Sequence, residues 1–228
     1  MQNFEQPESG KDWTDPIAGI QFKWIENLQI WAAVCQLTNA QYRLFRPDHS
    51  SGDYQGLSLD ADDQPVVLVS FNDGMDYCRW LTGKLSELGL HDEFLLRLPS
   101  HIEWTEMAEC SSVREYPWGD QWPPTYGNYG DESARKAFPE WECIEGYDDG
   151  YAVSCPVLEA GKNEYGLIGV GGNVYEWTFE AGGTRTELRG GSWSTFQPEY
   201  LKISNRYPRE PESRLVNFGL RLVMVRHQ

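Results

Sequence analysis

Between residues 111 and 195 the chain lacks the periodicity of a long helix or a regular strand. Gly, Pro, Asn, Asp and aromatic residues dominate this stretch, and no helical or alternating apolar pattern is sustained in it. A loop region of this length within a compact domain is held by something other than backbone ladders. The candidates for that role are buried Trp and Tyr side chains and a bound ion.

Regular elements are predicted on either side of this loop region. Three Ser or Thr residues are each followed three positions later by Gln, Asp or Glu, which is the spacing of a capping box at a helix start: Thr38, Ser70 and Ser100. The corresponding helices are expected to run through Phe45 and over 71–88 and 101–110. Short runs rich in β-branched or aromatic residues predict strands at 20–25, 29–34, 66–69 and 220–225.

The bulk composition fits one acidic, folded domain. Hydrophobic residues make up 40% of the 228 positions and aromatic residues 14%, which is enough to build a substantial core. No linker-like stretch divides the chain, so we expect a single domain over residues 1–228. The net charge of −16 disfavours nucleic acid and anionic membranes, and the sequence shows neither an apolar span nor a leader peptide. We therefore expect a soluble protein that binds neither.

Several motifs occur in a fixed order along the chain. GLIGVGGNVYEWT (166–178), LRGGSW (188–193) and ISNRYPREPESRLVNFGLRLV (203–223) close it, and LTNAQY (37–42), RLPSHIEWTEMA (97–108), YPWGD (116–120) and GYDDGYAVSCPV (146–157) precede them. In this order they resemble the formylglycine-generating enzyme, or sulfatase-modifying factor, family. The resemblance covers nearly the whole chain and implies an α+β domain, a variant of the C-type lectin fold in which irregular loops outweigh regular structure.

The chemistry of that family depends on residues that this chain lacks. The enzyme that names the family oxidises a substrate cysteine with two cysteines that bind copper(I), and soft thiolates suit that ion. The corresponding segment here, residues 194–218, contains no cysteine, and Pro198 and Ile203 lie nearest the two positions. Other relatives are iron(II) enzymes with histidine-rich motifs. The four histidines here show no such spacing: His49, His91, His101 and His227. We expect the protein to bind neither copper nor iron and to have no catalytic residues.

The five cysteines favour a reducing compartment. Their number is odd and they show no CxxC spacing. Secreted proteins resembling this chain tie the positions of Cys78 and Cys110 to C-terminal cysteines, and none follows Cys155 here. A bridge between Cys143 and Cys155 and two separate thiols are both compatible with the sequence, and the separate thiols are favoured. We expect a cytoplasmic protein.

A calcium site is implied by the resemblance. Asn128 and Asp149 match family positions whose side-chain oxygens bind Ca²⁺, and the carbonyls of Tyr129 and Tyr151 would complete the protein ligands. Hard oxygen donors suit this ion. The alternative is that Asn128, Asp148 and Asp149 only hydrogen-bond their own turns. The ion is the favoured interpretation.

A second family calcium site is left open. It would use Glu176 and the carbonyls of Gly172 and Val174, together with an asparagine side chain where this chain has Gly169. Losing one oxygen donor weakens a site whose ion prefers six or more. Glu176 then serves as an acceptor for loop amides instead.

The C-terminal segment alternates framework residues with mixed ones. Its spacing resembles the variable proteins of diversity-generating retroelements, which use the same fold and vary the gap positions to bind different ligands. The candidate ligand-binding residues are Ser194, Thr195, Phe196, Gln197, Glu199, Tyr200, Tyr207, Arg209, Glu210, Ser213, Leu215 and Asn217. Aromatic and arginine side chains are typical anchors of recognition surfaces. The alternative is that these residues form a neutral surface of an ordinary family member.

Three functions follow from these observations. The leading hypothesis is a non-catalytic module that binds a protein or a small molecule through residues 194–218. The second is a metal-dependent oxidase with a site of its own, and it requires at least three converging metal ligands. The third is a pseudo-enzyme that modulates a sulfatase system.

Overall fold

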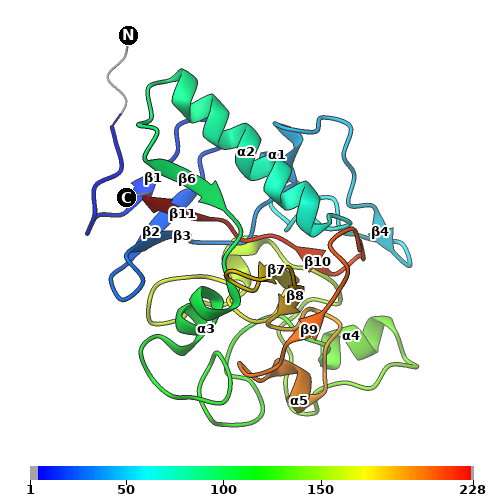
Figure 1. Cartoon of the computed structure of the whole chain (residues 1–228). Helices are drawn as coiled ribbons and strands as arrows, with labels where there is room; N and C mark the ends of the chain where they lie inside the picture. The colour runs from blue at the N-terminus through cyan, green and yellow to red at the C-terminus, as the bar shows by residue number, and fades with distance from the viewer. Residues whose placement is uncertain (1–4, 227–228) are drawn as a thin grey trace.

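The computed structural model describes residues 5–226, in which short helices and strands are joined by long loops (Figure 1). A five-stranded antiparallel sheet has the order β1-β2-β3-β11-β6, with the bounds Trp13–Thr14, Gln21–Ile25, Ile30–Ala33, Val223–Arg226 and Phe94–Arg97. A four-stranded sheet has the order β10-β7-β8-β9, with the bounds Phe218–Gly219, Tyr175–Phe179, Thr186–Arg189 and Tyr207–Pro208. A small hairpin pairs β4 (Asp53–Tyr54) with β5 (Leu57–Ser58).

Three of the helices begin where the sequence predicts. α1 (Asn39–Arg43), α2 (Phe71–Glu87) and α3 (His101–Glu109) start after Thr38, Ser70 and Ser100, and each start carries a complete capping box. The reciprocal bonds satisfy amide groups that have no partner within the helix. The remaining helices are short: α4 (Glu132–Ala137), the 3₁₀ turn Val157–Glu159 and α5 (Pro198–Leu201).

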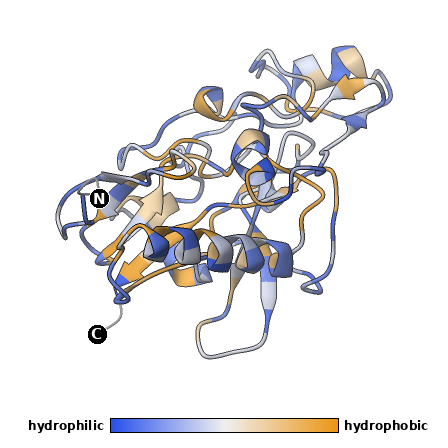
Figure 2. Cartoon of the chain, turned by 90° about the horizontal axis from the view of Figure 1, so that it is seen from above, coloured by the Kyte–Doolittle hydropathy of each residue, from blue (hydrophilic) through white to orange (hydrophobic). Residues whose placement is uncertain are grey.

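The largest helix, α2, covers the five-stranded sheet and buries one face against it (Figure 1). Tyr77, Cys78, Leu81 and Leu85 are buried on this face, at the helical spacing expected from the sequence. Figure 2 shows hydrophobic and hydrophilic residues alternating along this helix, as an amphipathic helix on a sheet requires. Leu88 follows the helix and is half exposed, so the apolar face ends at Leu85.

Two strand predictions need correction. Residues 66–69 form no strand, because Leu68 has a left-handed backbone conformation with φ of 59°, which an extended ladder does not tolerate. In the run at 220–225, strand β11 begins only at Val223, and the carbonyls of Leu220 and Leu222 accept single backbone hydrogen bonds from Leu37 and Ala33. β6, β7 and β8 carry no predicted strand, although β7 and β8 lie at the centre of the second sheet.

Aromatic packing holds the long loop region, as the sequence predicts. Tyr116 stacks on Trp118 with ring centroids 4.7 Å apart, and Trp141 stacks on Trp193 at 5.8 Å. Trp104 and Trp193 are almost wholly buried. The Trp141–Trp193 stack connects loops that lie far apart in the sequence, so aromatic contacts take the place of backbone ladders in the irregular region.

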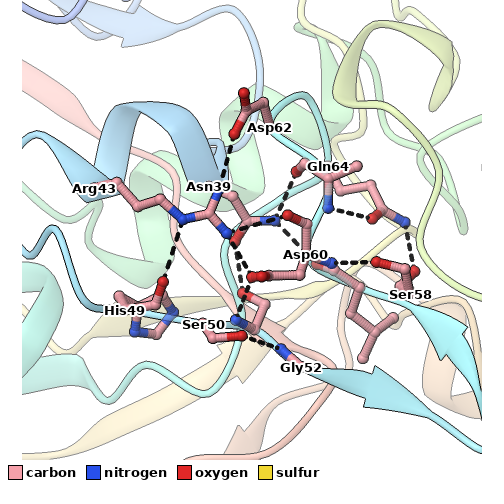
Figure 3. A network of polar contacts seen from close by, with 12 residues as sticks. Asn39, Arg43, His49, Ser50, Gly52, Ser58, Asp60, Asp62 and Gln64 are labelled. Carbon is pink, nitrogen blue, oxygen red and sulfur yellow. Dashed lines mark hydrogen bonds and ion pairs between the residues drawn. The ribbon is translucent and has the colours of Figure 1, made fainter.

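A polar network fixes the connection between α1 and α2 (Figure 3). The guanidinium of Arg43 donates to Asp62 at 2.8 Å and to Asp60 at 2.6 Å, while the amide of Asn39 donates to the carbonyls of Leu59 and Ala61 at 2.9 Å. These bonds replace the ladder contacts that the loop lacks. Within the described residues, no helix is both long and apolar enough to cross a membrane.

Candidate functional site

The C-terminal segment is seated on a buried framework. After β8 the chain turns at Gly190 and Gly191, both with positive φ, and Trp193 is 1% exposed. Ser192 donates its amide to the hydroxyl of Thr195, and the Thr195 carbonyl accepts the amide of Gly130 at 3.0 Å. The tight turn and the buried ring fix the start of the segment to the loop region.

This segment and the second sheet enclose a hollow of about 320 Å³, which we call the C-terminal hollow. Its lining consists of Tyr175, Ser194, Thr195, Gln197, Tyr200, Asn205, Tyr207, Leu215, Asn217 and Phe218. Seven of the twelve predicted ligand-binding residues are among them: Ser194, Thr195, Gln197, Tyr200, Tyr207, Leu215 and Asn217. Residues separated by more than twenty positions therefore meet at one place, because β9 and β10 return the chain to the same sheet.

The other five predicted residues lie around or away from the hollow. Phe196 packs against the cluster that contains Trp118, and the guanidinium of Arg209 lies 3.4 Å from the ring centroid of Tyr207. Glu199 and Glu210 are exposed, and Ser213 is half-buried.

Three lining residues are not predicted from the sequence: Tyr175, Asn205 and Phe218. Tyr175 and Phe218 face each other in the parallel register of β7 and β10. A parallel pairing of two short strands cannot be predicted from a local sequence pattern. The sequence therefore does not indicate that Tyr175 and Phe218 line the hollow.

The lining of the hollow carries no charged side chain. Tyr200 is 48% exposed and Leu215 is 50% exposed at its rim, while Thr195 is 5% exposed and donates its hydroxyl to Tyr175 at 3.2 Å. The side-chain polar atoms of Gln197, Tyr200 and Tyr207 make no hydrogen bond to any residue in the described range 5–226. The base is thus fixed by internal bonds, whereas the rim presents apolar surface and unused donors and acceptors.

The hollow offers no ligand for a soft metal ion. Thiol and imidazole groups are absent from its lining. Pro198 begins α5 and Ile203 is buried, so neither position nearest to the family's copper-binding cysteines supplies a donor atom. Among residues 5–226, no group of three or more His, Cys, Asp or Glu side chains is placed to hold a metal ion. His227 lies outside the described residues.

The four predicted calcium ligands lie together in the loop region. The Asp149 carboxylate accepts the amides of Tyr129 and Tyr151, each at 2.9 Å. Asn128 donates its Nδ2 to Val153 at 2.9 Å, and its Oδ1 is buried without a hydrogen-bond partner. Asp149 does bond its own turn, as the alternative interpretation expects, but that interpretation leaves the Asn128 oxygen unexplained.

The charges at this place also suit a cation. Burial raises the pKa of Asp149 to about 8, and the neighbouring Asp131 carboxylate acts in the same direction. Asp131 is itself buried, and its pKa is raised by burial. An orphaned amide oxygen and a desolvated carboxylate are hard donors that a calcium ion satisfies. The residues therefore fit the ion that the resemblance implies.

The second calcium set is arranged differently. Glu176 is buried and forms an ion pair with Arg221 at 2.8 Å, and it also accepts the indole N–H of Trp104 at 2.9 Å. The carbonyls of Gly172 and Val174 point at the side-chain amide of Gln36. A protein side chain occupies the centre of this set.

Residues 25–226 match the model of the sulfatase-modifying factor enzyme 1-like domain. The chain belongs to this family. It is 31% identical to the formylglycine-generating enzyme of Thermomonospora curvata over 162 residues, which cover 70% of this chain and 45% of that protein. It is 32% identical over 168 residues to the inactive C-alpha-formylglycine-generating enzyme 2 of Bos taurus, covering 69% of this chain and 49% of that protein. The chain thus spans about half the length of these relatives.

Solved structures confirm the fold. PvdO from Pseudomonas aeruginosa superposes with a TM-score of 0.67 at 17% identity and covers 96% of this chain and 99% of its own. Treponema denticola variable protein 1 superposes with a TM-score of 0.61 at 18% identity and covers 85% of this chain and 84% of its own. The α+β fold of the formylglycine-generating-enzyme type, with its sparse regular structure, is therefore the fold of this chain.

Proposed function

We propose that this protein is a non-catalytic binding module that recognises a protein or a small molecule through its C-terminal hollow. One observation carries the proposal: seven predicted contact residues converge on one uncharged hollow whose base is buried and hydrogen-bonded and whose rim is exposed. Preorganised aromatic rims of this kind give affinity with little loss of side-chain entropy. The similarity to a relative named inactive and to a variable protein supports the same function.

The chemistry of the lining restricts the class of ligand that can enter the hollow. Three tyrosine rings and Leu215 provide apolar contact, while amide and hydroxyl groups provide neutral hydrogen bonds. A charged ligand group would lose its hydration in this hollow without meeting an opposite charge. We therefore propose that the group entering the hollow is uncharged.

A metal-dependent oxidase receives less support. Copper(I) requires soft ligands, and the lining offers only oxygen and amide groups. The pseudo-enzyme hypothesis uses the same hollow with a protein of the sulfatase system as its ligand, so it is a special case of the proposed function.

We also propose that Ca²⁺ binds to Asn128, Asp149 and the carbonyls of Tyr129 and Tyr151. In this role the ion stabilises the loop that carries Gly130, which receives the C-terminal segment through Thr195. The function of the ion is structural, because it lies apart from the hollow's lining. The net charge of −16 supports a protein that binds neither nucleic acid nor anionic membranes, and the five free cysteines support a cytoplasmic location.

Ligand selection with matched variants tests the proposed function. A displayed peptide library and a glycan array are screened with the wild-type protein, and each isolated ligand is titrated calorimetrically against Tyr200→Ala, Leu215→Ser and Leu158→Ser. Leu158 is 70% exposed and does not line the hollow, so it is the control. We expect the first two substitutions to weaken binding about tenfold or more, and the control to leave it unchanged.

Two results would contradict this function. One is a set of ligands whose affinity is insensitive to both rim substitutions. The other is copper-dependent or iron-dependent oxygen consumption by the purified protein with a thiol peptide, because it would show a redox centre that a binding module does not need.

A further inference from the structure

The side-chain amide of Gln36 lies at the centre of a cage of oxygen atoms in the protein core. Gln36 follows β3 and is 2% exposed. Its Nε2 lies 3.0 to 3.2 Å from four acceptors, which are the carbonyl oxygens of Gly169, Gly172 and Val174 and Oε1 of Glu176. An amide nitrogen has only two hydrogens, so four converging acceptors exceed its capacity. Such convergence is more typical of the surroundings of a cation.

The charge in the cage gives a divalent cation only a weak net attraction, so binding there depends on the number of oxygen donors. Glu176 supplies its only carboxylate, and Arg221 already binds both oxygens of that group at 2.8 to 3.0 Å. Arg221 is fully buried and donates its remaining hydrogens to the carbonyls of Ala33, Val34 and Ile168. A calcium ion in the cage would therefore face a guanidinium and a carboxylate whose charge is already compensated.

A side chain at position 169 would crowd the amide of Gln36. Gly169 has φ of +68°, and a Cβ atom there would lie 3.2 Å from Cβ of Ala160, 3.3 Å from Oε1 of Gln36 and 3.4 Å from Cδ of Gln36. The asparagine that the family resemblance places at this position would start from this crowded Cβ, next to the glutamine amide. Position 169 is a glycine here, so the amide enters the cage unhindered.

We propose that the amide of Gln36 replaces a cation in this cage. As a neutral group, the amide connects the segment after β3 to residues 169–176 through its hydrogen bonds. The core around Gln36 and Glu176 therefore folds without a metal ion. The orientation of the amide follows from electrostatics, because its oxygen would be repelled by four acceptors. Its Oε1 is left buried without a hydrogen-bond partner, which is the cost of placing the nitrogen in the cage. Only the Asn128 and Asp149 set then depends on calcium.

Rebuilding the cage tests this inference. All variants carry Asp149→Asn, which removes the carboxylate of the other calcium set. The rebuilt cage combines Gln36→Ala with Gly169→Asn, because asparagine tolerates a positive φ and restores an oxygen donor. Gln21→Ala, an exposed glutamine on β2, is the control. The measurements are the shift of the thermal midpoint caused by Ca²⁺ and the luminescence of Tb³⁺ sensitised by Trp104, whose indole contacts Glu176.

We expect the rebuilt cage alone to bind Tb³⁺ saturably, to release it to Ca²⁺, and to gain about 5–10 °C in thermal midpoint at Ca²⁺ well above its dissociation constant. The Asp149→Asn background and the control should show neither effect. A Tb³⁺ signal in the background that Trp104→Phe abolishes would overturn the inference, because the native cage would then hold a cation. A folded, rebuilt cage that binds nothing would overturn it equally. If the rebuilt cage does not fold, the Asp149→Asn protein alone tests the inference: no Tb³⁺ luminescence that depends on Trp104 supports it, and such luminescence overturns it.

Discussion

The guanidinium of Arg221 and the carboxylate of Glu176 form an ion pair in the protein core, with their nearest atoms 2.8 Å apart and both side chains at most 1% exposed. Removing one partner leaves the other charge buried and uncompensated. We expect Arg221→Met to lower the free energy of unfolding by about 3–5 kcal/mol, as measured by urea denaturation. Arg226→Met is the control, because Arg226 pairs with Glu93 at the surface and should contribute about 1 kcal/mol or less. Equal losses for the two variants would contradict the buried pair's role.

The carboxyl group of Asp149 predicts a pH dependence in the presence of a chelator. Burial raises its pKa to about 8 in the folded protein, whereas an unfolded chain has a value of about 4. The folded state therefore holds a proton that the unfolded state has lost. The contribution to stability is fully present below about pH 4 and is lost as the pH rises through about 8.

Urea denaturation across this window checks the prediction against Asp149→Asn, which cannot titrate. The wild type should lose stability relative to the variant as the pH rises, by at most about 1.4 kcal/mol per pH unit. Calcium should stabilise the wild type more at the alkaline end, because binding the ion requires the ionised carboxylate. A constant difference between the two proteins at all pH values would refute the raised pKa.

What could be predicted from the sequence was local. The capping boxes at Thr38, Ser70 and Ser100 involve residues three positions apart, and all three helix starts are correct. The failed strand at 66–69 contains suitable residues, but Leu68 adopts a left-handed conformation that its composition does not reveal.

The site was predictable only in part for the same reason. The spacing of framework and mixed residues indicated most of the hollow's lining, whereas Tyr175 and Phe218 depend on a parallel strand pairing. Gln36 carried no signal, because its partners lie more than 130 positions away. Long-range contacts of this kind are set by the tertiary fold.

The cysteines are expected to react in two classes. Cys78 and Cys155 are wholly buried, and burial raises the pKa of each to about 12, while Cys35, Cys110 and Cys143 are partly accessible. Since the thiolate is the reactive form, a chromogenic disulfide reagent should modify three thiols in the native protein and five in denaturant. Only three reactive thiols in denaturant would show that two of the five cysteines are joined, contrary to the structure.

Gly191 and Gly182 have the same φ of +76° but different surroundings. A Cβ atom at Gly182 meets nothing within 4 Å, whereas one at Gly191 would lie 2.3 Å from Cδ2 of Leu201, which is fully buried. Both alanine substitutions incur the conformational cost of about 1–2 kcal/mol, and Gly191→Ala should lose about 1–3 kcal/mol more through overpacking.

The same pair of variants links the framework to binding. Leu201 ends α5, so its displacement moves the adjacent Tyr200 at the rim of the hollow. Gly191→Ala should therefore weaken ligand binding, although Gly191 does not line the hollow, whereas Gly182→Ala should leave binding unchanged. Both variants are titrated with the same selected ligand below their unfolding temperatures. Unchanged affinity in Gly191→Ala would mean that the rim adjusts independently of the framework, which is the behaviour of a surface that is not preorganised.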